Sequence, residues 1–152
     1  MACRIRRMTL RDYDAVYALW RETPGVGLDA DSDSRAAIGR YLKRNPGSCY
    51  VACAGGKIVG AVLSGHDGRR GYLHHLAVAA TQRRQGIGQA LVSRCLAALA
   101  RRHIPKCNIF VLRTNVSGIA FWLHQGWLRR EQVRLLQKPT RAVERKGVGS
   151  RC

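Results

Sequence analysis

Apolar residues follow two different periods along this chain, and the changes of period divide it into elements. Alternating or continuous short apolar runs predict strands over residues 3–8, 48–54, 57–64, 71–78, 107–112 and 127–138. An apolar period of 3.6 residues predicts four helices. The first runs from Thr9 to about Pro24, the second ends at Asn45, the third runs from Gln85 and ends before Pro105, and the fourth covers 116–124. The resulting order, β-α-α-β-β-β-α-β-α-β, indicates an α/β fold with a single mixed, mostly antiparallel sheet flanked by helices.

The ends of these elements define one domain and a tail. Gly55 and Gly56 predict a two-residue hairpin turn between two antiparallel strands, because paired glycines tolerate positive φ angles. The pattern supports a domain over residues 1–138. Residues 139–152 are basic and almost free of large apolar groups, so we expect this tail to be poorly ordered.

Charge narrows the range of partners. The 152 residues include 27 Lys plus Arg against 9 Asp plus Glu, a formal net charge of +18. This balance favours acidic or phosphorylated partners, and contact with nucleic acid or a ribosome stays open. The basic residues are scattered, however, and no zinc-finger, basic-zipper or aromatic-basic RNA motif accompanies them, so a solvated basic surface is the simpler interpretation.

The remaining composition favours an ordinary intracellular protein. No apolar run approaches the roughly 18 residues that span a bilayer, so we expect no membrane partner and a cytoplasmic location. The six cysteines contain no C-x-x-C pair, and Cys49 and Cys53, which share one face of a predicted strand, have no matching histidines nearby. This predicts reduced structural thiols and no metal site.

The segment from Tyr72 to Val92 holds the clearest chemistry. A strand leads through a basic loop to two glycines one residue apart, and a helix follows. Backbone N–H groups at a helix start have no intrahelical acceptors and favour a phosphate. Gly86 and Gly88 would let such a ligand approach the backbone, and Arg83 and Arg84 would add charge beside it. Neither a nucleotide-triphosphatase loop nor a complete dinucleotide fingerprint fits, because the Lys-Ser/Thr pair and the third glycine are missing.

Two segments resemble a known family. Leu76-Ala77-Val78 followed by Arg83-Arg84-Gln85-Gly86-Ile87-Gly88 resembles the acetyl-CoA-binding signature R/Q-x-x-G-x-G/A of the GCN5-related N-acetyltransferase (GNAT) superfamily. The segment Asn115-Val-Ser-Gly-Ile-Ala-Phe-Trp-Leu-His-Gln-Gly-Trp127 is similar to that family's second cofactor segment. The resemblance covers residues 3–138 and is closest in style to ribosomal-protein-alanine N-acetyltransferases.

The resemblance implies a cofactor site. Acetyl-CoA would be the acetyl donor, with no metal, and its pantetheine arm would run along Leu76, Ala77 and Val78. Its diphosphate would be held by the loop and helix start, which comprise Arg83, Arg84, Gln85, Gly86, Ile87, Gly88, Gln89 and Ala90. Asn115 matches the family's cofactor-contacting asparagine.

The sequence departs from the family at positions that concern catalysis. Trp122 stands where a tyrosine usually protonates the leaving thiol, and Phe110 stands where some peptide acetyltransferases carry a glutamate. His74 is the remaining candidate for the general base, since an imidazole with a pKa near 6.5 suits proton removal from an amine. Strand alternation predicts that His74 shares the face of Leu76, with His75 on the opposite face.

These residues together predict an N-acetyltransferase that moves an acetyl group from acetyl-CoA to a primary amine by direct attack. The acceptor would be a small amine or a protein N-terminus, and self-association into a homodimer stays open. Two alternatives remain: an acyl-CoA-binding regulatory module with impaired catalysis, and a basic RNA-binding domain.

Overall fold

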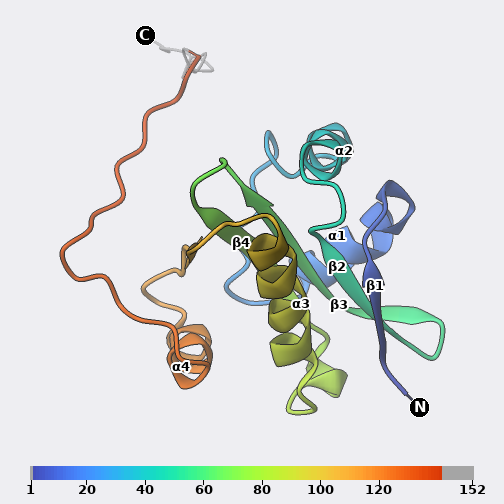
Figure 1. Cartoon of the computed structure of the whole chain (residues 1–152). Helices are drawn as coiled ribbons and strands as arrows, with labels where there is room; N and C mark the ends of the chain where they lie inside the picture. Colours follow the sequence, from blue (N-terminus) through green and yellow to red (C-terminus); the bar gives the residue numbers. More distant parts are fainter. Residues whose placement is uncertain (1, 142–152) are drawn as a thin grey trace, which may run out of the picture.

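The computed structural model describes residues 2–141, and Figure 1 shows the arrangement of its elements. Most of the tail predicted over 139–152 lies outside the described residues, so its disorder stays a prediction. The helices are α1 (Tyr13–Arg21), α2 (Arg35–Arg44), α3 (Ile87–Arg101) and α4 (Val116–His124), with short 3₁₀ turns η1 (Leu10–Asp12) and η2 (Ala80–Gln82). The strands are β1 (Arg4–Arg7), β2 (Tyr50–Ala54), β3 (Lys57–His66), β4 (Gly71–Val78) and β5 (Cys107–Ile109).

The strands form one sheet in the order β1-β2-β3-β4-β5. The first four are antiparallel to their neighbours, and β5 joins the edge of β4 in parallel orientation. The predicted α/β class with a mixed, mostly antiparallel sheet is therefore confirmed, and so is the hairpin turn at Gly55 and Gly56, which both have positive φ angles.

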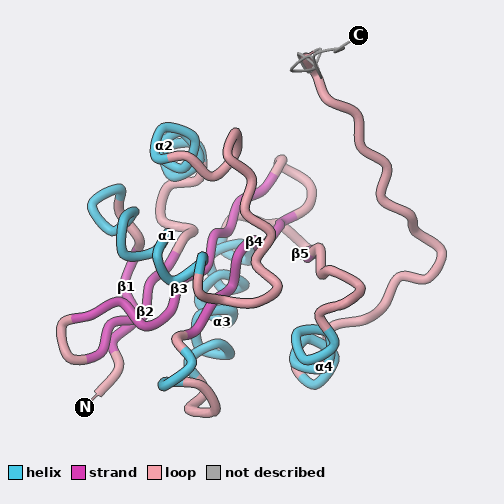
Figure 2. Tube along the Cα trace, turned by 180° about the vertical axis from the view of Figure 1, so that it is seen from behind, coloured by secondary structure: helices cyan, strands magenta, loops and turns pink. Residues whose placement is uncertain are grey.

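Each face of the sheet carries its own hydrophobic core. α3 covers one face, where Leu91 and Cys95 are fully buried against β2 and β3. α1 and α2 cover the other face, where Trp20 and Ile38 are buried. Figure 1 and the opposite view in Figure 2 show α3 on one side of the sheet and α1 and α2 on the other. Burial on both faces explains why β3 is apolar along most of its length.

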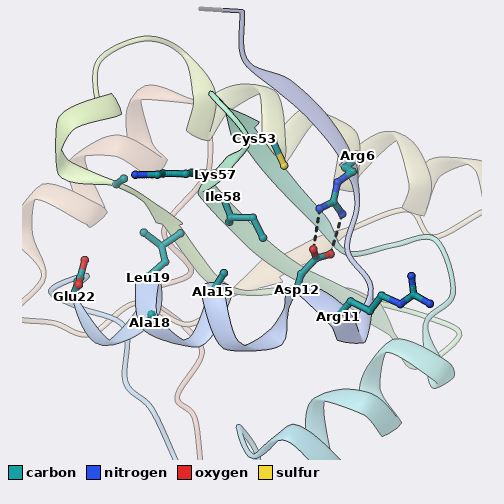
Figure 3. Close-up of a pocket in the computed structure, with 12 residues that line it drawn as sticks. Arg6, Arg11, Asp12, Ala15, Ala18, Leu19, Glu22, Cys53, Lys57 and Ile58 are labelled. Carbon is teal, nitrogen blue, oxygen red and sulfur yellow. Dashed lines mark hydrogen bonds and ion pairs between the residues drawn. The ribbon is translucent and has the colours of Figure 1, made fainter.

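A capping box joins β1 to α1. The Asp12 carboxylate accepts a hydrogen bond from the Thr9 N–H, and its two oxygens form a bidentate pair with the Arg6 guanidinium at 2.8 Å each. This pair lies in an open groove of about 570 Å³ between α1 and the β2–β3 hairpin, shown in Figure 3. The groove contains none of the residues that the sequence marks as catalytic or cofactor-binding.

The C-terminal part differs from the prediction. Residues 127–138 form no strand, and the predicted strand over 107–112 ends at Ile109. Leu128 and Leu136 are 84% and 90% exposed, and Figure 1 shows the chain leaving the body of the molecule after α4. The physical reason is the short edge of the sheet, because three residues of β5 offer few backbone groups with which a further strand could pair.

Candidate functional site

The loop between β4 and α3 changes direction sharply. Arg83 donates its Nε–H to the carbonyl oxygen of Val78 at 3.0 Å, which ties the loop back to the end of β4. Arg84 and Gly86 both have left-handed backbone conformations, with φ angles of 64° and 77°. Glycine adopts this conformation freely, whereas an arginine adopts it at a cost. The two left-handed residues let α3 begin directly at Ile87.

The start of α3 offers a row of free backbone donors. Within the part of the chain that the structure describes, the N–H groups of residues 84–89 have no hydrogen-bond acceptor, and the first bonded one is Ala90 N–H to Gly86 O at 3.0 Å. The side chains of Arg83, Arg84 and Gln85 are exposed beside this row. A Cβ built on Gly86 would meet nothing within 4 Å, so the space above the loop is open. The donors, the helix dipole and the arginines fit a diphosphate.

The edge of β4 is unpaired next to this loop. The ladder with β5 runs only from Gly71 and Cys107 to Leu73 and Ile109, after which the two strands separate. The predicted pantetheine-contacting residues Leu76, Ala77 and Val78 lie on the unpaired part. A backbone edge of this kind can hydrogen-bond the amides of an extended ligand as a strand would.

A β-bulge in β4 overturns the predicted side-chain alternation. Val62 on β3 lies opposite two residues of β4, His75 and Leu76, and His75 has a left-handed φ of 55°. Leu76 packs against the α3 core, whereas the His74 ring lies against Tyr41 of α2. His74 and Leu76 therefore point to opposite faces, and the prediction that they share a face was wrong. The extra residue shifts the alternation by one.

His74 lies in an aromatic environment on the α2 side of the sheet. Its ring is near those of Tyr72 and Phe110, with centroid distances of 6.3 Å to each. The side chain is partly buried, and burial lowers the pKa of His74 from its usual 6.5, with the neighbouring His75 acting in the same direction. The imidazole is therefore neutral at pH 7 and can accept a proton.

His75 makes an interaction that the sequence did not predict. Its Nε2 lies 2.8 Å from Oδ1 of Asp33, in the loop between α1 and α2, and both side chains are largely buried. The His75 carbonyl oxygen accepts a hydrogen bond from the indole of Trp20 at 3.0 Å. This network fastens the α1–α2 loop and α1 to the bulge. No local sequence signal could have shown it, because Asp33 and His75 are 42 residues apart.

Asn115 caps α4. Its Oδ1 accepts a hydrogen bond from the Gly118 N–H at 3.0 Å, and its side chain lies close to Gly25 in the loop after α1. From the same helix, Phe121 lies over Gly88, where a Cβ would come within 3.4 Å of its ring. α4 is thus held near both the α1 end and the start of α3, with Asn115 as an anchor of that arrangement.

Trp122, at the position where the family usually has a tyrosine, is packed among apolar and aromatic side chains. Its ring meets those of Phe121 and Trp127 edge to face, and it packs against the α3 core. An indole has only an N–H donor, whose pKa is too high for proton transfer to a thiolate.

The described residues contain no group of three or more His, Cys, Asp or Glu that could hold a metal ion. None of the helices in this part of the chain has the length and hydropathy of a membrane span.

Comparison with known proteins identifies the family. The sequence model of the Acetyltransferase (GNAT) family matches residues 13–127. An acetyltransferase of Sodalis glossinidius is 32% identical over 127 residues, which cover 84% of this chain and 88% of that protein. The chain belongs to the GNAT acetyltransferase family, as its two motifs indicate, and it is an acetyl-CoA-dependent acetyltransferase.

Solved structures with the same fold include two enzymes of different specificity. The diaminobutyrate acetyltransferase EctA from Paenibacillus lautus, in complex with L-2,4-diaminobutyric acid and coenzyme A, has a TM-score of 0.69 at 24% identity, with 82% of this chain and 74% of that chain covered. A ribosomal-protein-alanine N-acetyltransferase from Brucella melitensis biovar Abortus 2308 also has a TM-score of 0.69, at 17% identity, with 91% and 100% covered. At these identities the likeness concerns the fold.

Proposed function

We propose that this protein transfers the acetyl group of acetyl-CoA to a primary amine, either a small amine or a protein N-terminus, by direct attack. The observation that carries the proposal is the row of free N–H donors at residues 84–89, placed where the unpaired edge of β4 ends. One arrangement of backbone groups thus offers an anion site and an extended hydrogen-bonding edge in succession.

The chain's own groups divide the work of binding. Residues 83–90 would hold the diphosphate through backbone N–H groups and through the charges of Arg83 and Arg84. The backbone of Leu76, Ala77 and Val78 would hold the extended arm, and one N–H of this edge would polarise the reacting carbonyl. Bound acetyl-CoA supplies an acetyl thioester. Asn115 would act by keeping α4 in place beside the site, because its side chain already caps that helix.

His74 is the proposed general base. Its imidazole is neutral at pH 7, since burial lowers its pKa, and it lies on β4 immediately before the bulge. A neutral imidazole can take the proton of an incoming ammonium, directly or through one water molecule. We assign no general acid, because Trp122 cannot supply a proton to the departing thiolate. The thiolate of a thiol with an ordinary pKa near 8.5 can depart without a general acid, and the reaction is then about 10² to 10⁴ times slower.

Calorimetry with coenzyme A tests the anion site. Gly86→Val is expected to abolish the binding heat, because a β-branched side chain at a φ of 77° distorts the loop and covers its N–H groups. Gly56→Val is the matched control, since Gly56 has a φ of 75° and equally open surroundings in the β2–β3 turn. Loss of binding in both variants, or in neither, contradicts the assignment of the loop.

A pH profile tests His74. Acetylation of a primary amine by the wild type should fall only below pH 6.5, in line with the lowered pKa of His74. His74→Asn should reduce kcat by about 10²-fold and remove this acidic limb, whereas His103→Asn, at an exposed histidine, should change neither. An unchanged limb in His74→Asn excludes His74 as the base. Coenzyme A binding without acetylation of any amine would instead favour the regulatory module.

A further inference from the structure

Three rings form a shelf beside the proposed base. We define the aromatic shelf as Tyr72 and His74 on β4 with Phe110, which directly follows β5. Their centroids are 6.0 to 6.3 Å apart, and their planes are inclined to one another by only 9° to 30°. The parallel pairing of Tyr72 with Asn108 brings the two segments together, so the shelf exists only in the folded sheet.

The shelf is not part of the hydrophobic cores. Tyr72 is half-buried but belongs to neither buried cluster nor to the residues packed against them, and Phe110 is 56% exposed. Tyr41 of α2 closes the shelf on the side of His74, with a centroid distance of 6.2 Å between these two rings. A phenyl ring left in water does not contribute the free energy that its burial would give. This exposure beside a proposed catalytic group is typical of a ligand-binding surface.

Charge decides which ligand suits the shelf. The chain has a formal net charge of +18, which repels amines that carry several positive charges. The carboxylate of Asp33, which pairs with His75 next to the shelf, is 7% exposed in its side chain and already accepts hydrogen bonds from the Asp29 N–H and from His75. No free carboxylate is therefore at hand among these groups to bind a second ammonium. Aromatic faces attract flat apolar groups and rings instead.

We propose that the acceptor is an aromatic monoamine, or a peptide N-terminus with an aromatic side chain, whose ring stacks on the shelf of Tyr72, His74 and Phe110. This inference rests on the proposed function, because it places the amine beside His74. Phe110 acts as a specificity-determining residue that binds the ring of the acceptor. Phe110 follows the end of β5 directly, and more than half of its surface is exposed to solvent.

Steady-state kinetics with three amines test the inference. We expect kcat/KM to be highest for 2-phenylethylamine, about tenfold lower for 2-cyclohexylethylamine, whose ring is not flat, and lowest for spermidine. Phe110→Ala should raise KM for 2-phenylethylamine about tenfold and leave kcat within twofold, with little effect on spermidine. Leu112→Ala is the matched control, because Leu112 is 53% exposed in the same segment and belongs to no ring pair.

Binding measurements separate the two proposals. Saturation-transfer NMR with 2-phenylethylamine and coenzyme A-saturated protein reports contact with the ring whether or not acetyl transfer occurs. A signal that Phe110→Ala removes and Leu112→Ala preserves supports the shelf, even if no amine is acetylated and the proposed function fails. Absence of the signal in the wild type, or equal rates with spermidine, overturns the inference while amine acetylation by itself would still stand.

Discussion

The contact between Asp33 and His75 offers the sharpest test of how this site is held together. Asp33→Ala removes a carboxylate that accepts from the Asp29 N–H and pairs with His75 Nε2, at 2.8 Å each. Hydrogen bonds to a charged group contribute about 1.5 to 3 kcal/mol each. Because the exposed Asp29 segment can turn its N–H to water, we expect a loss of about 2 to 4 kcal/mol in the free energy of unfolding. A typical domain stability of about 5 to 15 kcal/mol leaves the variant folded.

Urea denaturation followed by tryptophan fluorescence measures this loss, since Trp20 donates to the His75 carbonyl oxygen. A double-mutant cycle with His75→Asn isolates the pair, because asparagine tolerates the left-handed backbone at this position. We expect a coupling of about 1 to 2 kcal/mol. Asp67→Ala is the control, as Asp67 accepts two backbone N–H groups within one exposed turn, and it should cost less than about 1 kcal/mol. Equal losses for Asp33→Ala and Asp67→Ala, with no coupling, would refute the reasoning.

Three further predictions concern acid stability, packing and thiol reactivity. Hydrogen bonds from the arginine on β1 hold the pKa of Asp12 below its usual 3.8, so the stability it contributes is present above that value and is lost as the pH falls through the lower, folded value. In urea denaturation between pH 5 and 2, the free energy of unfolding should therefore fall less with decreasing pH for Asp12→Asn than for the wild type. An equal pH dependence in the two proteins would contradict the stabilising role of the arginine–Asp12 pair. Gly65→Ala should lower the free energy of unfolding by about 1 to 3 kcal/mol, because its Cβ would lie 2.6 Å from a tyrosine hydroxyl of α2. Gly27→Ala is the control: its Cβ would meet nothing within 4 Å, so it should change that free energy by less than about 0.5 kcal/mol. Thermal denaturation that fails to separate the two variants would contradict this packing. Iodoacetamide at pH 8 should label the exposed Cys3 well before Cys49, whose pKa burial raises to about 11; peptide mass spectrometry showing equal rates would contradict the burial of Cys49.

The local elements of this fold were predictable because their signals lie in neighbouring residues. The continuous apolar run of β3 and the 3.6-residue period of α3 each mark a surface that must be buried. The anion loop was predictable for the same reason, since the glycines, the arginines and the helix start are consecutive. Its role in holding a diphosphate stays a prediction, as do the roles of His74 and Asn115.

Two predictions failed because they needed information from elsewhere in the chain. The face of His74 depends on a bulge that is fixed by how β4 registers against Val62, and alternation within β4 alone cannot reveal it. The strand expected over 127–138 has an adequate pattern, but a strand requires a partner edge, and β5 supplies only three residues.

The sequence by itself determined the order of the elements from β1 to α4, the family and the place of the anion loop, because each of these depends on residues close together along the chain. The tertiary structure alone decided which side chains surround the proposed base. Phe110 reaches Tyr72 and His74 through the parallel pairing of β5, and Asp33 reaches His75 through the packing of α1 on the sheet. Contacts across such distances depend on register and packing, which the whole chain sets together when it folds.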